Sequence, residues 1–362
     1  MAGPVRGSGR RERPVSDIPV VTAAEAARAE HLLVPTATEH LTAGDVLTVV
    51  DLDAVGSPQE AAVRLGQAHR VLVGVARRRV SPAAGTLLDA LTLTLSTVPQ
   101  PGRSHIRVDD VDAALDQLTE ALHGAPRAAL TLAGLLRLTP LLPVPDALVA
   151  ESLAFSMLLA GPEFAAWRRA HPARPVPPAT ADAVLLERTG DRLCVTLNRP
   201  ARRNALGREM RDQLIDALAV AADPGVAVVH LRGTGSDFCS GGDLDEFGTA
   251  ADPATAHAVR LARSAGYAVH RCAGRVQVHV RGACMGAGVE VPAFAGRMVA
   301  APGAYFALPE LSLGLVPGAG GTVSLPRRIG RWRTAWMALT GERIDAARAH
   351  CWGLVDAVTA DA

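Results

Sequence analysis

Two glycine-rich turns are the part of this sequence that points most directly to chemistry. The first, CSGGD, covers residues 239–243, and the second, GACMGAG, covers residues 282–288. Glycine lets the backbone approach a ligand closely, and a turn that opens a helix presents unpaired N–H groups and the positive end of the helix dipole. Such a turn stabilises negative charge, either on a bound phosphate or on the oxygen of an enolate held in an oxyanion hole.

The residues around the turns restrict these uses without choosing between them. A dinucleotide-binding fingerprint fits poorly, because Val291 stands where its third glycine would be. A tight turn made only for packing stays open. Glu290 lies in the apolar run GAGVEVPAFAG, which is an unusual place for a solvated carboxylate. Cys239 has no histidine nearby in the sequence, so we do not expect it to be an activated nucleophile.

The elements that would position these turns alternate along the second half of the chain. Each glycine-rich turn follows a predicted strand and precedes a predicted helix, which indicates an α/β architecture. The predicted strands are 193–200, 226–233 and 276–280, and the predicted helices are 206–222, 254–272 and one that begins near Ala287.

The first half of the chain has a different pattern of predicted elements. Residues 46–51 and 71–76 read as short buried strands with a helix between them at 58–66, and three further helices follow from Val111 onward. Four prolines in the ten residues HPARPVPPAT predict a semi-rigid linker. We therefore divide the chain into a flexible tail, a mainly helical α/β accessory region, the linker and an α/β core, at residues 1–20, 21–170, 171–180 and 181–362.

Composition excludes several functions. The net charge of +1 gives no general attraction to nucleic acid or anionic membranes, and no apolar run reaches the 18 residues of a membrane span. The chain has no lysine, which excludes a lysine Schiff base. Five scattered cysteines without C-x-x-C spacing indicate reduced thiols and a cytoplasmic protein, and the eleven histidines form no metal-binding motif. No secretory signal is expected, because no apolar segment follows the basic N-terminus.

Five segments together resemble the crotonase (enoyl-CoA hydratase/isomerase) superfamily, in the family's order and at its natural spacing. They cover about residues 183–358. The segments are LNRPARRNAL (197–206), DFCSGGDL (237–244), RGACMGAGVEV (281–291), FALPELSLGLVPGAGGTVSLPRRIG (306–330) and LTGERIDAARAHCWGLVDAV (339–358). The resemblance implies a repeated ββα superhelix in the C-terminal half.

The resemblance also implies roles for individual residues. The backbone N–H groups of Ser240 and Ala287 would form the oxyanion hole, with alanine standing where the family usually has glycine. Glu290 would activate water and Glu310 would deliver a proton to Cα of the acyl group. No separate cofactor is implied, because coenzyme A is part of the substrate. The residues expected to line the substrate path are Ser240, Gly241, Gly242, Asp243, Gly286 and Ala287.

Three activities stay open on these grounds. The retained glutamate pair favours hydration of an enoyl-CoA or the reverse dehydration; an isomerase, or a non-catalytic partner with the same fold, are the alternatives. Members of the family usually continue with helices that cover the active site and build trimers, whereas this sequence stops at Ala362. We therefore expect residues 21–170, which could be a degenerate crotonase-like unit, to cover the core or a neighbouring subunit of a homo-oligomer. Arg199, Arg202 and Arg203 are candidates for coenzyme A phosphate contacts.

Overall fold

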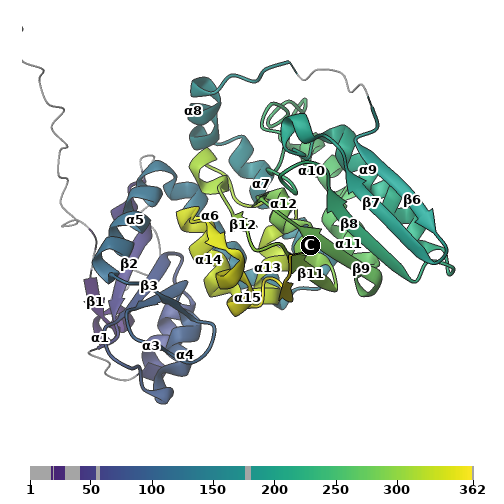
Figure 1. The fold of residues 1–362 in the computed structure, drawn as a ribbon. Coiled ribbons are helices and arrows are strands. Elements are labelled where there is room, and N and C mark those ends of the chain that lie inside the picture. Colours follow the sequence, from purple (N-terminus) through teal and green to yellow (C-terminus); the bar gives the residue numbers. More distant parts are fainter. Residues whose placement is uncertain (1–17, 19, 29–40, 54–57, 176–180, 361–362) are drawn as a thin grey trace, which may run out of the picture.

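The structure, a computed structural model, describes residues 18, 20–28, 41–53, 58–175 and 181–360 (Figure 1). Nearly all of the predicted tail at 1–20, and residues 176–180 of the predicted linker, lie outside the described residues.

A parallel sheet of five strands forms the first part of the chain, with its strands side by side in sequence order. Two of these strands, β2 and β3, lie where buried apolar runs predict them, whereas the other three were not predicted. Alternate side chains of a strand point to opposite faces, and both faces are covered: Val49 and Val73 belong to one apolar cluster, and Val50 and Leu72 belong to another. The strands are β1 (Val20–Thr22), β2 (Leu47–Asp51), β3 (Val71–Ala76), β4 (Leu93–Ser96) and β5 (His105–Arg107).

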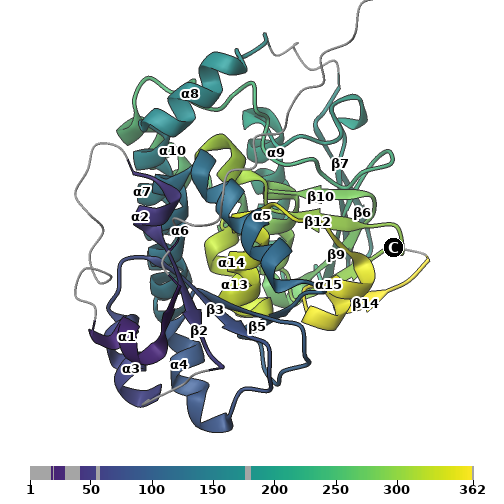
Figure 2. The ribbon, with the colours of Figure 1, turned by 90° about the vertical axis from the view of Figure 1, so that its left-hand side faces the viewer.

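Helices of this region lie on both sides of the sheet and then lead to the second half (Figures 1 and 2). Helix α5 begins after Asp110, whose carboxylate accepts the N–H groups of Asp112 and Ala113, as expected for a helix cap. The helices are α1 (Ala23–Arg28), α2 (Ala43–Val46), α3 (Pro58–Gly66), α4 (Gly85–Ala90), α5 (Val111–Gly124), α6 (Pro126–Leu138), α7 (Val144–Leu159) and α8 (Pro162–Ala170).

Two sheets form the second part. The larger has the order β14-β11-β9-β8-β7-β6 and is parallel except for the β6–β7 hairpin; the smaller has the order β10-β12-β13. The pairs β9–β10 and β11–β12 each place one strand in each sheet. The strands are β6 (Val184–Thr189), β7 (Arg192–Leu197), β8 (Val228–Gly233), β9 (Val276–Val280), β10 (Ala283–Met285), β11 (Arg297–Ala300), β12 (Tyr305–Ala307), β13 (Ile344–Asp345) and β14 (Ala357–Val358).

One of the three helices predicted around these sheets is broken in two. The single helix predicted for 254–272 is broken into α10 and α11, because Ser264 caps a new helix by accepting the Tyr267 N–H at 3.1 Å. The helices are α9 (Arg208–Ala219), α10 (Pro253–Ala262), α11 (Ala265–Arg271), α12 (Ala287–Glu290), α13 (Gly321–Ile329), α14 (Arg331–Thr340) and α15 (Ala346–Trp352), with a short 3-10 helix η9 (Glu310–Leu313).

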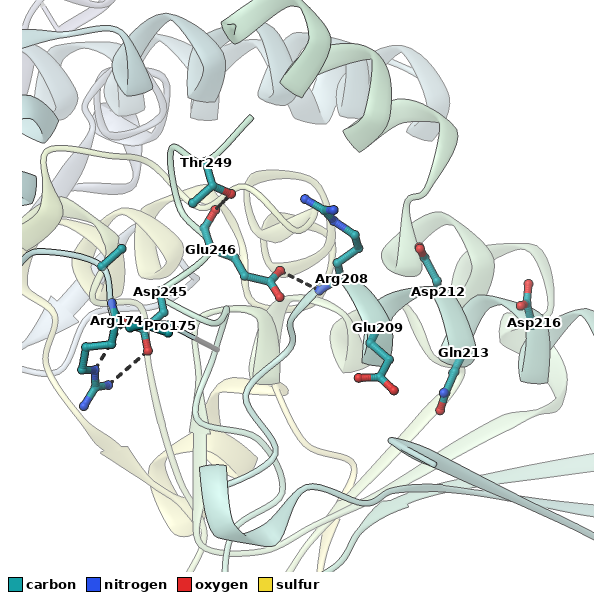
Figure 3. A pocket seen from close by; sticks show the side chains of 11 residues that line it. Arg174, Pro175, Arg208, Glu209, Asp212, Gln213, Asp216, Asp245, Glu246 and Thr249 are labelled. Atoms are coloured by element: carbon teal, nitrogen blue, oxygen red, sulfur yellow. Dashed lines mark hydrogen bonds and ion pairs between the residues drawn. The ribbon is translucent and has the colours of Figure 1, made fainter. Parts of the chain in front are cut away.

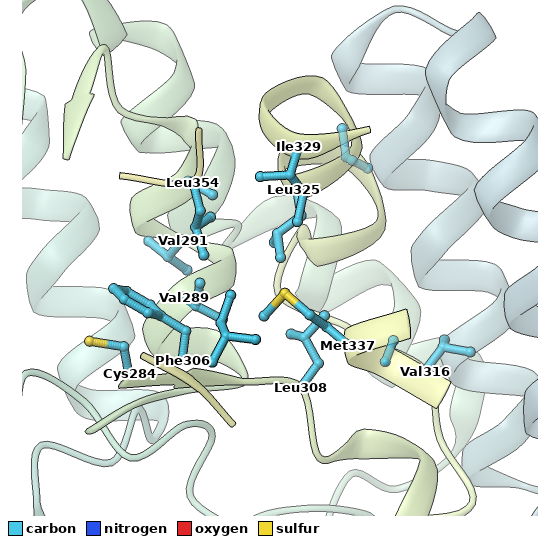
Figure 4. Packing of buried hydrophobic residues seen from close by; sticks show 14 of the residues in the cluster. Cys284, Val289, Val291, Phe306, Leu308, Val316, Leu325, Ile329, Met337 and Leu354 are labelled. Carbon is cyan, nitrogen blue, oxygen red and sulfur yellow. The ribbon is translucent and has the colours of Figure 1, made fainter. Parts of the chain in front are cut away.

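One apolar cluster joins the two halves of the chain. It contains side chains of α5, α6 and α7 together with those of β9, α13 and α14, and Figure 4 shows its packing around Phe306, Leu325 and Met337. Hydrogen bonds cross the same boundary: the Thr139 hydroxyl donates to the Thr322 carbonyl at 2.5 Å, and Arg327 donates to the Leu142 carbonyl at 2.7 Å. The accessory region therefore covers the core of its own chain.

No single helix among the described residues has both the length and the apolar composition of a membrane span. Helices α7 and α8 meet that test only as a pair, and they are bent by 60° relative to each other.

Candidate active site

The two glycine-rich turns lie side by side, as predicted. The Cys239 N–H donates to the Ala283 carbonyl at 3.1 Å, and the Met285 N–H donates to the Cys239 carbonyl at 3.0 Å. The contact is so close that a Cβ on Gly288 would lie 2.3 Å from the Cys239 carbonyl oxygen. Glycine is required there because no side chain fits between the two backbones.

The expectation that the Ser240 amide is unpaired is wrong. Its N–H donates to the Arg203 carbonyl at 2.9 Å, because residues 202–206 run alongside the first turn. In the same segment, the Leu206 carbonyl accepts the Asp243 N–H at 3.2 Å. These bonds occupy the amides on one side of the turn, so Ser240 is not available as an oxyanion donor in this arrangement.

Neither the Gly242 nor the Ala287 N–H has an acceptor among the described residues. The same holds for the amides of Gly241, Gly282 and Gly288 in the two turns. Ala287 is the first residue of α12, where an N–H has no partner within the helix. Gly242 was expected to line the substrate path and not to be a donor. The direction of an N–H depends on backbone torsions and on the neighbouring segment, so the residue types alone did not distinguish Gly242 from Ser240.

Glu290 is buried at the end of α12, with 2% of its surface exposed. Its Oε2 accepts the N–H groups of Ala319 and Gly321 at 2.7 and 2.8 Å. Burial raises its pKa well above the ordinary value, and the charges of Glu310 and Glu151 raise it further, whereas the two amide bonds oppose the rise. The amides also fix the carboxylate in place.

Glu310 begins η9 directly after Pro309 and is 8% exposed. Its Oε1 lies against the second turn, since a Cβ on Gly286 would be 2.4 Å from it. Its Oε2 is buried and has no hydrogen-bond partner among the described residues. Burial raises the pKa of Glu310 to about 8. The pKa values of Glu290 and Glu310 are thus both raised, as a proton donor near neutral pH requires.

A third buried glutamate, Glu151 on α7, was not predicted. It is 2% exposed, and burial raises its pKa to about 7 against the opposing effects of bonds from Thr322 and Gly320 and of the Arg260 charge. The signal in the sequence is a lone acidic residue in the apolar stretch ALVAESLAFSMLL, because acidic side chains are rarely buried without partners. The described residues contain no group of three side chains arranged to hold a metal ion.

The polar residues of the first turn are paired within the chain. Asp243 is 2% exposed and accepts Arg202 Nη2 at 2.8 Å and the Asp245 N–H at 3.2 Å, so it caps the turn. Arg203 pairs with Asp237 at 2.8 Å. Two of the three arginines considered for phosphate binding thus have carboxylate partners already.

A separate groove of about 750 Å³ opens near the start of α9 (Figure 3). Its acidic side chains outnumber its arginines, which disfavours a polyanionic ligand such as coenzyme A. Within it, Arg174 pairs with Asp245 at 3.2 Å, and Glu246 accepts the Arg208 N–H at 2.7 Å. Neither Glu290 nor Glu310 lines this groove. Its lining residues are Ala173, Arg174, Pro175, Arg208, Glu209, Asp212, Gln213, Asp216, Asp245, Glu246 and Thr249.

Comparison with known proteins places this geometry in a family. The sequence profile of the family described as enoyl-CoA hydratase/isomerase matches residues 190–362. The chain is 38% identical over 170 residues to 2,3-dehydroadipyl-CoA hydratase of Escherichia coli (strain K12), which covers 46% of this chain and 65% of that protein. It is 35% identical over 189 residues to a mevalonyl-coenzyme A hydratase of Beauveria bassiana (strain ARSEF 2860), covering 50% and 68%. The crystal structure of enoyl-CoA hydratase from Thermoplasma volcanium GSS1 aligns with a TM-score of 0.47 and 33% identity over 50% of this chain and 73% of that chain.

The chain belongs to the enoyl-CoA hydratase/isomerase family, that is, to the crotonase superfamily. It spans about two thirds of the length of the curated relatives named above. The matched segment contains both glycine-rich turns, Glu290 and Glu310, whereas Glu151 lies outside it.

Proposed function

We propose that this protein adds water to the double bond of an enoyl-CoA thioester, or removes water from a 3-hydroxyacyl-CoA. The observation that carries the proposal is the pair of buried carboxyl groups, Glu290 and Glu310, beside two converging turns. Like charges in one buried site do not ionise together easily, so one group holds a proton while the other is free to accept one.

The proposed oxyanion hole consists of the Gly242 and Ala287 amides. The thioester oxygen would accept both N–H groups and take up negative charge as the Cα–Cβ double bond polarises. Preorganised amides in a buried site stabilise such an enolate without reorganising during the reaction. The unpaired state of these two amides supports this assignment, and the repeated pattern of strands β9–β10 and β11–β12 supports the ββα superhelix that the family resemblance implies.

The proton transfers are assigned to the two glutamates. Glu290 takes a proton from water, the water oxygen bonds to Cβ, and the π electrons move to the thioester oxygen. Glu310 then gives its proton to Cα as the enolate collapses, and dehydration runs through the same steps in reverse. The two amide bonds to Glu290 favour its ionised form, which suits a base, while the unpartnered Oε2 of Glu310 suits a donor.

A panel of enoyl-CoA and 3-hydroxyacyl-CoA thioesters tests the proposal, with loss or gain of the conjugated thioester absorbance as the readout. Glu290→Gln and Glu310→Gln should each reduce kcat by on the order of 10²–10⁴-fold with little change in thioester binding. Glu187→Gln, an exposed residue on β6, is the matched control. A loss confined to Glu310→Gln would favour an isomerase, and binding without any turnover would favour a non-catalytic partner.

Two further properties are proposed on separate grounds. The described cysteines are all free thiols, which supports a reducing, cytoplasmic location. Helix α7 exposes Val149, Leu153 and Met157 along one face, at 37%, 54% and 57%. Such a stripe supports self-association, and light scattering coupled to gel filtration would detect the oligomer.

A further inference from the structure

We propose that Glu151, on α7 of the accessory region, is a positioning residue for the Glu290 carboxylate and acts through the backbone of residues 319–322. This inference rests on the proposed function, because that function makes Glu290 the base. It extends the candidate active site to a segment outside residues 190–362, the part that the family profile matches.

Two carboxylates bind alternate amides of residues 319–322, where a loop leads into the start of α13; we call this segment the 319–322 loop. The odd-numbered amides donate to Glu290, as described above. The even-numbered ones donate to Glu151: Gly320 N–H to Oε1 at 2.6 Å and Thr322 N–H to Oε2 at 2.8 Å. The Thr322 hydroxyl adds a third bond to Oε2 at 2.7 Å. Because four consecutive amides are divided between two side chains, a movement of the loop away from Glu151 moves the donors of Glu290 as well.

The rest of α7 is fitted to the same loop. Leu148, Glu151 and Phe155 are spaced three and four residues apart, so they share one helix face. A Cβ on Gly318 would lie 2.3 Å from Phe155 Cδ2, and a Cβ on Gly320 would lie 3.4 Å from Leu148 Cδ2. The helix therefore packs directly on the loop backbone, and Glu151 reaches the amides from a fixed support.

The contacts of Glu151 are those of a support and not of a proton carrier. Both of its oxygens are engaged by the loop, and no cation forms an ion pair with it among the described residues. Arg260 on α10, whose charge lowers the pKa of Glu151, donates instead to the hydroxyls of Ser152 and Ser156 at 3.0 Å each. Its guanidinium also lies 4.5 Å from the centre of the Phe155 ring.

Glu151 also adds negative charge to the site. The ionisable groups around it are Glu290 on α12, Glu310 on η9 and Arg260 on α10, and its charge raises the pKa of both other glutamates. Removing that charge should therefore shift the limbs of the pH–rate profile to lower pH. A residue that only stabilised the fold would not produce this shift.

The test compares Glu151→Gln with Asp146→Asn, which removes a carboxylate from the exposed first turn of the same helix. The glutamine side chain has one acceptor oxygen, and its NH₂ group faces an amide donor. We expect kcat to fall by on the order of 10–10²-fold with KM nearly constant, since small misplacements of a reacting group have effects of this size. In a Glu290→Gln background the same change should cost little more, because both act on one carboxylate.

A second measurement does not depend on turnover. Hydrogen exchange at the amides of residues 320 and 322 should be at least about tenfold faster in Glu151→Gln than in Asp146→Asn, because their acceptors are weakened. The proposal would be overturned if Glu151→Gln had the same amide exchange rates, kcat and pH–rate profile as the parent protein. If that variant does not fold, Thr322→Val removes only the hydroxyl bond and should show a smaller fall in kcat, and a parental kcat there would overturn it too. If the parent turns over no thioester, the proposed function fails, while the exchange result still decides the role of Glu151.

Discussion

Gly321→Ala is the sharpest single test of the position of Glu290. Gly321 is the first residue of α13, and a Cβ added there would lie 2.6 Å from Glu290 Cγ, 2.8 Å from its Oε2 and 2.8 Å from Pro317 Cβ. The shortest ordinary contact of a Cβ is about 3.4 Å. The glutamate side chain or the helix start must therefore move by roughly 1 Å, whereas the amide that binds Glu290 keeps its hydrogen.

The effects on rate and on stability should separate. A displacement of about 1 Å at a reacting group lowers rates by on the order of 10²-fold, so we expect kcat to fall by that factor while KM stays within a few-fold. The free energy of unfolding should fall by only about 0–2 kcal/mol, because overpacking costs about 1–3 kcal/mol and alanine improves helix propensity by up to about 1 kcal/mol. Thioester turnover and thermal melting measure the two quantities.

Gly303→Ala is the matched control, since a Cβ at this exposed turn would meet no atom within 4 Å. It should keep parental kcat and melting temperature. If Gly321→Ala turns over substrate as fast as Gly303→Ala, the placement of Glu290 does not limit the reaction, and its assignment as the base is wrong.

Three further outcomes are expected. The free energy of unfolding should fall as pH rises from about 5 to 8, because buried Glu151 and Glu310 hold protons in the folded state that the unfolded chain releases near pH 4.5. For Glu151, a pKa raised to about 7 corresponds to roughly 3 kcal/mol of this stability. Thermal melts of Glu151→Gln should therefore show a flatter pH dependence than those of the parent. Removing residues 1–175 should cause aggregation in gel filtration, since α13 and α14 lose their cover, and a soluble, fully active fragment would contradict this. An alkylating reagent should label exposed Cys351 in the native protein but leave Cys239, whose pKa burial raises to about 12, until denaturant is added, as mass spectrometry would show.

Local patterns predicted much of the secondary structure. Strand β9 and helix α5 lie where the apolar periodicity placed them, and for α5 the cap residue Asp110 makes the start readable in the sequence. Strands β1 and β5 have only three residues each, too few for a pattern to emerge. The helix break at Ser264 was missed because the apolar periodicity continues across it, although serine is a common cap.

The side chains of the candidate site could be predicted from the sequence, but the backbone groups could not. Glu290 and Glu310 could be named from motifs, and their burial and raised pKa values agree with a buried acid–base pair. The donor that we propose in the first turn lies two residues after the predicted one, at Gly242 instead of Ser240, because every residue type has the same backbone amide. The role of Glu151 could not be predicted from the sequence, because its partners are 169 and 171 residues away and only tertiary packing brings them together.

The same separation has a consequence for biosynthesis. Ribosomes add about 5–20 residues per second, so roughly ten to thirty seconds pass between the synthesis of Glu151 and that of Gly320, its partner 169 residues later. During that interval the inner face of α7 has emerged without the loop that covers it, and it presents an apolar surface with an unpaired acid in its middle. A nascent chain of this protein should therefore depend on holding chaperones until the C-terminal segment has been made, and slowing translation between residues 160 and 320 should lower the yield of folded protein.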